Sequence, residues 1–134
     1  MSTTFRLRIS TPDGLIFDDE VTSFKARMID GDVGILANHT NYVSAVGAGE
    51  AVIHQADGQT RKAACIGGML SVISNEAHLI ATTFEWADDI DLERAMRAKE
   101  RAEQRLAEAK DDAHEVTLAT AKLRRALVRI GVKS

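Results

Sequence analysis

The stretch HLIATTFEWADDIDLERAMRA, residues 78–98, contains the change of pattern that decides the fold. Its first part, His78–Phe84, predicts a β-strand, whereas Asp88 and Asp89 are favourable N-cap residues for a helix that begins near Ile90. The first 88 residues carry eight of the nine glycines, the only proline and all six aromatic residues, with a net charge of −5. The last 46 residues carry nine alanines and no aromatic residue, with a net charge of +2. The chain therefore combines a β-rich body with a helical tail.

Short alternating segments separated by turn residues fill the predicted first domain, residues 1–87. Phe5–Ser10 and Thr22–Met28 alternate apolar and polar side chains, which is the period of a half-buried strand. Asp57-Gly58 is a two-residue hairpin signal, and Gly67-Gly68 predicts a bulge or a close backbone approach. About eight to ten such strands fit either a β-sandwich or a barrel. Because no helical crossover connects them, the strand pairs must be mainly antiparallel.

The predicted second domain, residues 88–134, has the pattern of two helices. Apolar residues recur at every third or fourth position over Leu92–Ala109 and again over Val116–Ile130. Asp112 resembles the N-cap of the second helix, and Gly131 is a natural terminator. The short connection predicts an antiparallel hairpin. Because its facing positions are mostly alanine, the hairpin buries little apolar area and should be able to come apart or re-dock.

Composition and spacing argue against several classes of protein. No apolar run approaches the about 20 residues of a membrane helix, and MSTTFRLRIS lacks a signal-peptide core, so we expect a soluble, intracellular chain. The net charge of −3 argues against a nucleic-acid binder. The four histidines have no metal-ligand spacing, and Cys65 lies in an apolar strand, which predicts a buried structural thiol. His39 is either a loop-organising residue or a general base, but no nucleophile or carboxylate is evident beside it.

The arginines of the tail are more informative than its other polar residues. Arg94 and Arg101 lie two turns apart on one face of the first predicted helix, and Arg125 and Arg129 lie one turn apart on the second. In a hairpin, these side chains could converge on an anion such as a polyphosphate. Solvated arginines in ordinary helical ion pairs are the alternative, and spacing alone favours that alternative.

Three motifs make the chain similar to a known family. Gly31–His39 (GDVGILANH) closely resembles a loop motif of the epsilon subunits of F-type ATP synthases. Gly67–Val72 (GGMLSV) resembles the second signature of that family, and Ile90–Ala95 (IDLERA) resembles the start of its C-terminal hairpin. The order and separation of the three motifs agree over essentially the whole chain. One departure is Ala37-Asn38, where the family usually has Pro-Gly, although Asn tolerates the left-handed conformation that such a turn needs.

The resemblance implies a flattened antiparallel β-sandwich of about ten strands followed by a two-helix hairpin. It implies a non-catalytic subunit of the rotating central stalk, whose sandwich binds the gamma subunit and the c-ring. The hairpin would inhibit ATP hydrolysis when it extends towards the alpha and beta subunits of the catalytic head. The expected location is peripheral, at the cytoplasmic face of the bacterial inner membrane or the equivalent plastid face, with membrane contact only through the complex.

The resemblance also implies a regulatory ATP site in the docked hairpin, with no cofactor required and no metal site. The family positions that carry over to this site are Glu85, Ile90, Asp91, Arg94, Arg101, Arg125 and Arg129. The first helix would hold the adenine side, at Ile90, Asp91 and Arg94, and the other arginines would hold phosphates. Asp32 and His39 are expected at the interface with the c-ring or gamma. Two alternatives remain: a stand-alone ATP-sensing module, and a small enzyme that uses His39.

Overall fold

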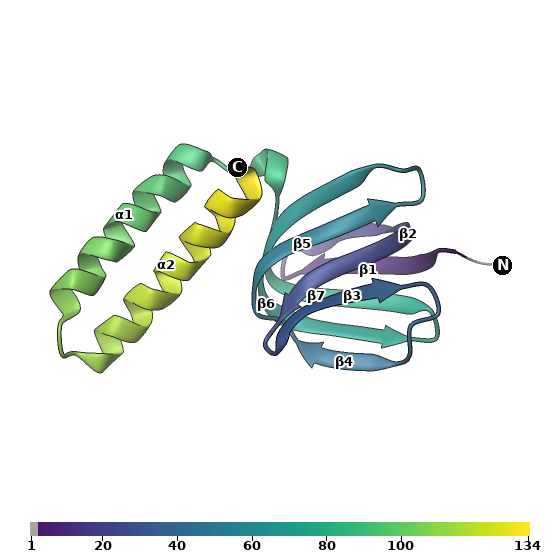
Figure 1. The fold of residues 1–134 in the computed structure, drawn as a ribbon, viewed down its shortest axis with the longest axis horizontal. Helices are drawn as coiled ribbons and strands as arrows, with labels where there is room; N and C mark the ends of the chain where they lie inside the picture. Colours follow the sequence, from purple (N-terminus) through teal and green to yellow (C-terminus); the bar gives the residue numbers. More distant parts are fainter. Residues whose placement is uncertain (1–2) are drawn as a thin grey trace. The chain divides into compact units, whose positions relative to one another are not determined.

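The computed structural model describes residues 3–134, which form two compact units that divide between Trp86 and Ala87 (Figure 1). The first unit holds all seven strands of the described residues, and the second holds a 3₁₀ turn and two α-helices. The strands are β1 (Phe5–Thr11), β2 (Gly14–Met28), β3 (Gly31–Leu36), β4 (Tyr42–Ala45), β5 (Ala48–Gln55), β6 (Thr60–Ile73) and β7 (Glu76–Trp86). The remaining elements are η1 (Ala87–Asp89), α1 (Leu92–Ala109) and α2 (Ala113–Lys133).

The strands close into a flattened β-sandwich. The hydrogen-bonded order is β1-β7-β6-β5-β2-β3, β4 adds to β6, and β1 also pairs with β2. The pairing therefore returns to its starting strand, and each of the long strands β2 and β6 pairs with three other strands. As predicted, the pairs are antiparallel, except that β1 runs parallel to β7, with Arg6 opposite Glu76 and Ser10 opposite Ile80.

The prediction of about ten strands is wrong, because the described residues contain seven. Segments that the sequence suggests as separate strands continue through bends into one long strand. In β2, the pairing register with β5 shifts between Val21 and Ser23. In β6, the bend lies at Gly67 and Gly68, whose φ angles are +76° and +121°. A Cβ on Gly68 would overlap the carbonyl oxygen of Ile80, so the predicted close backbone approach is confirmed.

The hydrophobic core of the sandwich is built from the inward positions of the alternating strands. Phe5, Leu7 and Ile9 of β1 are buried, and the polar residues between them are not, as the alternation predicts. Phe24 of β2 and Leu79 of β7 are fully buried in the same cluster. The predicted structural thiol is also confirmed in its placement: Cys65 is buried, and burial raises its pKa to about 12.

The two helices form an antiparallel hairpin (Figure 1). Its contact face is made mostly of small residues. Its helices bury Ala95 and Ala102 from α1, and Ala119, Ala126 and Val132 from α2. The narrow alanine stripe predicted from the sequence is therefore present. Neither helix of the described residues is long and apolar enough to cross a membrane.

The ends of the helices differ in part from the prediction. Asp91, and neither Asp88 nor Asp89, is the N-cap of α1, and its carboxylate accepts a hydrogen bond from the Arg94 amide at 3.1 Å. Asp88 and Asp89 lie instead in η1, which precedes the buried Ile90. Asp112 caps α2 as predicted.

Gly131 does not terminate α2, which continues to Lys133. Two features of the helical unit explain why the helix continues past Gly131. Val132 is buried, and the Lys133 ammonium donates to the Ala87 carbonyl oxygen at 3.1 Å.

Candidate functional site

A groove of about 330 Å³ lies between the two helices. Its walls are one face of each helix, with residues at positions i, i+3, i+4 and i+7. From α1 the lining residues are Ala98, Arg101, Ala102 and Arg105, and from α2 they are Lys122, Arg125, Ala126 and Arg129. Because the alanines let the helices approach, the long basic side chains form the rim of the groove.

The lining of the groove is rich in basic side chains. Five of its eight lining residues are cationic and none is acidic. Two ion pairs of α1 lie outside the groove: Arg97 with Glu93 at 3.9 Å, and Lys99 with Glu103 at 4.0 Å. None of Arg101, Arg105, Lys122 and Arg125 has a carboxylate within 4.0 Å in residues 3–134. The arrangement is suited to binding a multivalent anion.

Three of the seven residues expected at a nucleotide site line this groove together, namely Arg101, Arg125 and Arg129. Arg94 is exposed on the first turn of α1 and continues the same row of the helix, one turn before Ala98. The carboxylate of Asp91 is engaged as the N-cap of α1.

The other two expected residues are placed differently. Ile90 is buried, with 4% of its surface exposed. Glu85 lies on β7, in the sandwich unit.

Sequence reasoning missed two cations of the groove, Arg105 and Lys122. The signal was present in the spacing, because Arg105 lies four residues after Arg101 and Lys122 lies three residues before Arg125. Both intervals keep a side chain on the same helix face. Neither position belongs to the family motif, so neither was predicted as a site residue.

A second candidate surface lies on the outer face of the sandwich. Val43, Met69, Ile73 and Ile80, which we call the apolar strip, are 62%, 46%, 55% and 54% exposed. They lie on the adjacent strands β4, β6 and β7, where Met69 is opposite Ile80 and Val43 is opposite Ser71. Adjacent exposed apolar side chains of this kind mark sites of protein–protein contact.

The edge of the apolar strip is polar. The Ser10 hydroxyl and Nε2 of His78 lie 3.1 Å apart in a hydrogen bond, on the strands β1 and β7. An apolar centre with a polar edge is the usual composition of a protein interface.

His39 and Asp32 lie in the region of the GDVGILANH motif. Nδ1 of His39 hydrogen-bonds the Thr40 carbonyl oxygen at 2.7 Å, and its ring packs edge-on to Tyr42. Asn38 has φ +64°, so it adopts the left-handed conformation expected of it. Asp32 lies on β3, where Oδ1 is 3.7 Å from Arg27. The contacts of His39 organise the loop, whereas that of Asp32 joins the paired strands β2 and β3.

The sequence predicts no metal site. In residues 3–134, no group of three or more His, Cys, Asp or Glu side chains is placed to hold a metal ion.

Each of the two units matches a family of known proteins. The model of the ATP synthase delta/epsilon chain β-sandwich domain matches residues 4–87, and that of the delta/epsilon chain long α-helix domain matches residues 88–134. The ATP synthase epsilon chain of Caldicellulosiruptor bescii is 43% identical over 102 residues, covering 76% of this chain and 74% of that protein. The epsilon chain of Lacticaseibacillus casei is 37% identical over 137 residues, covering 99% and 96%.

The fold also matches a solved structure. A chain in the structure of the Euglena gracilis mitochondrial ATP synthase, described as OSCP/F1/c-ring, superposes with a TM-score of 0.83 at 19% identity. The match covers 92% of this chain and 78% of that chain. Both family models, the relatives matched over nearly the full length and the shared fold lead to one conclusion: this chain belongs to the epsilon chain family of ATP synthases.

Proposed function

We propose that this chain is a non-catalytic rotor subunit that couples rotation of an ion-driven c-ring to the catalytic head. The sandwich would bind the gamma subunit and contact the c-ring, with Asp32 and His39 in the contact region. One related structure is described as the central stalk and c-ring of the Tetrahymena thermophila ATP synthase, and its chain matches with a TM-score of 0.53. The expected location is peripheral, on the cytoplasmic face of a bacterial inner membrane or the equivalent plastid face.

The observation that carries this proposal is the apolar strip. Four large apolar side chains at 46–62% exposure are costly to leave in water, and a partner surface would remove them from it. Gamma is the partner we propose for the strip, because the family assignment supplies a rotor partner and the strip offers a continuous surface over three strands.

Binding to purified gamma tests this assignment. Met69→Asp and Ile80→Asp should each weaken binding at least about tenfold, because a charge would be buried in an apolar contact. The matched control is Leu15→Asp, at a side chain that is 58% exposed and outside the strip. Unchanged affinity in both strip variants, with the fold intact, would remove gamma from this surface.

The hairpin is proposed as the regulatory part, which inhibits ATP hydrolysis when it extends towards alpha and beta. Support comes from its alanine contact face, because small buried areas leave a small free-energy gap between docked and extended forms. Removing residues 89–134 should relieve inhibition and retain gamma binding, since the core cluster lies within Phe5–Ala81. Loss of gamma binding in the truncated chain would contradict this division of roles.

ATP is proposed as the regulatory ligand of the hairpin. The support is the groove in which Arg101, Arg125 and Arg129 meet. Calorimetric titration of the full chain with ATP should show binding that Arg125→Ala weakens about tenfold, while Arg97→Ala, outside the groove, has little effect. No heat at millimolar ATP would exclude the ligand and leave the rotor role intact.

The same groove is the feature that supports the alternative of a stand-alone ATP-sensing module. That alternative predicts ATP binding without any affinity for gamma, so the two titrations together separate the candidates.

A further inference from the structure

The three asparagines of the chain, Asn38, Asn41 and Asn75, meet at one end of the sandwich, and we call them the asparagine cluster. Asn38 and Asn41 belong to the loop between β3 and β4, and Asn75 belongs to the turn between β6 and β7. We propose that Asn41 and Asn75 are positioning residues, which hold the loop that carries His39 in the conformation in which it contacts gamma. The inference rests on the proposed gamma contact and extends it to residues that act through the loop.

Two side-chain amides fasten the loop to the turn. Oδ1 of Asn75 accepts a hydrogen bond from the Asn38 amide at 2.6 Å, and Oδ1 of Asn41 accepts one from the Ser74 amide at 3.1 Å. The partners are 37 and 33 positions apart in the chain. Because the loop donates in one bond and the turn donates in the other, each segment holds the other in place.

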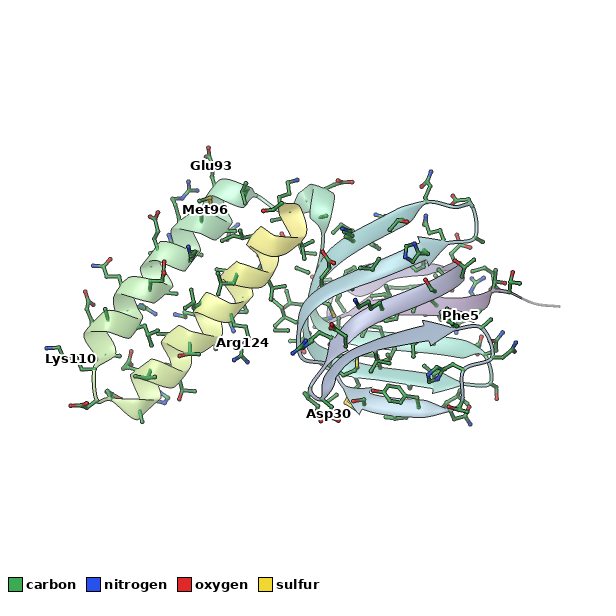
Figure 2. All side chains as sticks on the ribbon, in the orientation of Figure 1. Phe5, Asp30, Glu93, Met96, Lys110 and Arg124 are labelled. Atoms are coloured by element: carbon green, nitrogen blue, oxygen red, sulfur yellow. The ribbon has the colours of Figure 1, made fainter. Side chains whose placement is uncertain are left out.

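Asn75 also ties these two segments to the start of β1. Its Nδ2 donates to the Thr4 carbonyl oxygen at 3.1 Å, and its own carbonyl oxygen accepts from the Arg6 amide at 3.3 Å. Figures 1 and 2 show the β3–β4 loop, the β6–β7 turn and the start of β1 at one end of the sandwich, which the labelled Phe5 marks. The labelled Asp30 lies at the other end (Figure 2). Asn75 therefore joins three segments that are far apart in the sequence.

The backbone at the asparagine cluster is left-handed. Asn38, Ser74 and Asn75 have φ angles of +64°, +50° and +65°, and they are three of the four non-glycine residues with positive φ in residues 3–134. Glycine adopts this conformation without strain and is the usual second residue of a two-residue hairpin turn. A glycine at position 75 would satisfy the turn but would lack the amide that bonds to Asn38 and Thr4. The turn geometry alone therefore does not call for Asn, whereas its long-range contacts do.

The fastened segments are flanked by exposed apolar side chains. Leu36 precedes the loop and is 63% exposed, Val43 follows the loop, and Ile73 precedes the turn. Val43 and Ile73 belong to the apolar strip, so the loop adjoins the surface proposed for gamma. Residues 36–43 contain no Lys, Arg, Asp or Glu. This end of the sandwich is therefore suited to a partner surface that is itself apolar and uncharged.

A loop that is held in advance lowers the cost of binding. A free loop would lose backbone and side-chain freedom when the partner binds, and this loss of entropy reduces the affinity. The ring of His39 is held by the Thr40 carbonyl oxygen and by the ring of Tyr42, which are contacts between neighbouring residues. The bonds of Asn41 and Asn75 instead link the loop to the turn, so they fix where the His39 contact is presented.

The test combines amide hydrogen exchange by NMR with the affinity of the full chain for purified gamma. The variants are Asn75→Ala and Asn41→Ala. The matched control is Asp57→Ala, which removes a bond of the same kind from the β5–β6 turn, where Oδ1 of Asp57 accepts from the Gln59 amide at 2.9 Å.

The two cluster variants should change both readouts. The Asn38 amide in Asn75→Ala and the Ser74 amide in Asn41→Ala should exchange at least about tenfold faster than in the wild type. The dissociation constant for gamma should rise about fivefold to tenfold in each variant, because the loop must then be ordered on binding. Asp57→Ala should leave the affinity unchanged.

A double-mutant cycle separates positioning from a merely structural role. His39→Ala should weaken gamma binding about fivefold in the wild-type background but less than about twofold in Asn75→Ala, because the contact is already impaired there. A general loss of stability would leave the two effects additive.

The failure of this inference differs from the failure of the proposed function. Unchanged exchange in both cluster variants, unchanged affinity in both, unchanged affinity in His39→Ala, or additive losses in the cycle would each overturn the positioning role. Losses in Met69→Asp and Ile80→Asp would then still keep gamma on the apolar strip. Absence of binding between the wild-type chain and gamma would overturn both the gamma contact and the positioning role.

Discussion

The guanidinium carbon of Arg61 lies 3.5 Å from the centroid of the Trp86 ring. Trp86 is the last residue of β7, and its ring also packs edge-on to Phe84 at 4.9 Å and, tilted, against Phe17 at 6.0 Å. Arg61 therefore covers an aromatic cluster at one end of the sandwich core.

Arg61→Ala should lower the free energy of unfolding by about 1 kcal/mol, because the cation–π contact and the packing of the arginine stem are both lost. Trp86 is the only tryptophan, so its fluorescence should shift to longer wavelength as the ring gains solvent. Urea unfolding followed by fluorescence measures both effects. Lys62→Ala, at the exposed neighbouring residue, should change neither by a comparable amount.

Gly68→Ala should destabilise the sandwich by more than about 3 kcal/mol, because the new Cβ overlaps the Ile80 carbonyl oxygen and φ is +121°. The comparison is Gly34→Ala, where a Cβ meets no atom within 4 Å and φ is not positive. Chemical denaturation of both variants measures the difference. If Gly68→Ala unfolds at the same denaturant concentration as Gly34→Ala, the backbone approach at β6 and β7 is looser than described.

Asp112→Ala should lower the helicity of the hairpin and cost about 1 kcal/mol, because the His114 and Glu115 amides lose their side-chain acceptor. Asp111→Ala changes the same charge one residue earlier, outside the cap position, and serves as the control. Circular dichroism and thermal unfolding of the full chain are the measurements. A larger loss in Asp111→Ala than in Asp112→Ala would contradict the assigned cap.

Acid should weaken the contact between β1 and β2 through Asp18. The hydrogen bond from Arg6 Nε, at 2.6 Å, lowers the pKa of the Asp18 carboxyl below its ordinary 3.8. Because the folded pKa is the lower one, the contact stabilises the fold fully above pH 3.8 and is lost as pH falls through the folded pKa.

Denaturation of the wild type and Asp18→Asn between pH 6 and pH 2 measures this effect. The stability difference between them should be largest near neutral pH and shrink below about pH 4. Arg6→Leu should remove the same pH-dependent part. A difference that stays constant down to pH 2 would show that Asp18 acts through packing alone.

Much of the fold could be predicted from the local pattern of the sequence. The predictions that were wrong have identifiable physical causes. The alternation around Leu7 predicts which face is buried, because strand periodicity acts within a few residues. The local sequence does not select the N-cap of α1, because Asp88, Asp89 and Asp91 all have a suitable carboxylate. Burial of Ile90 and the η1 turn leave Asp91 as the residue with extended backbone next to the helix, and such tertiary burial is not a local property.

The same distinction applies to the strands and to the groove. A bend such as that at Gly67 and Gly68 looks in the sequence like the end of a strand, although the hydrogen bonding continues on both sides. In the groove, Arg101, Arg125 and Arg129 could be selected by motif. Arg105 and Lys122 lie outside the motif, although their spacing from Arg101 and Arg125 places them on the same helix faces.

The parallel pairing of β1 with β7 has a consequence for synthesis of the chain. One edge of β1 pairs with β2, the next strand, but Leu7 also lies opposite Ala77, so the other edge waits for a partner made about 70 residues later. The emerging polypeptide cannot close the sandwich on the ribosome until β7 has left the exit tunnel, and that edge of β1 lacks its native partner during the interval. The helical residues are translated after the strands, so all the strands of the first unit are available before the hairpin is complete.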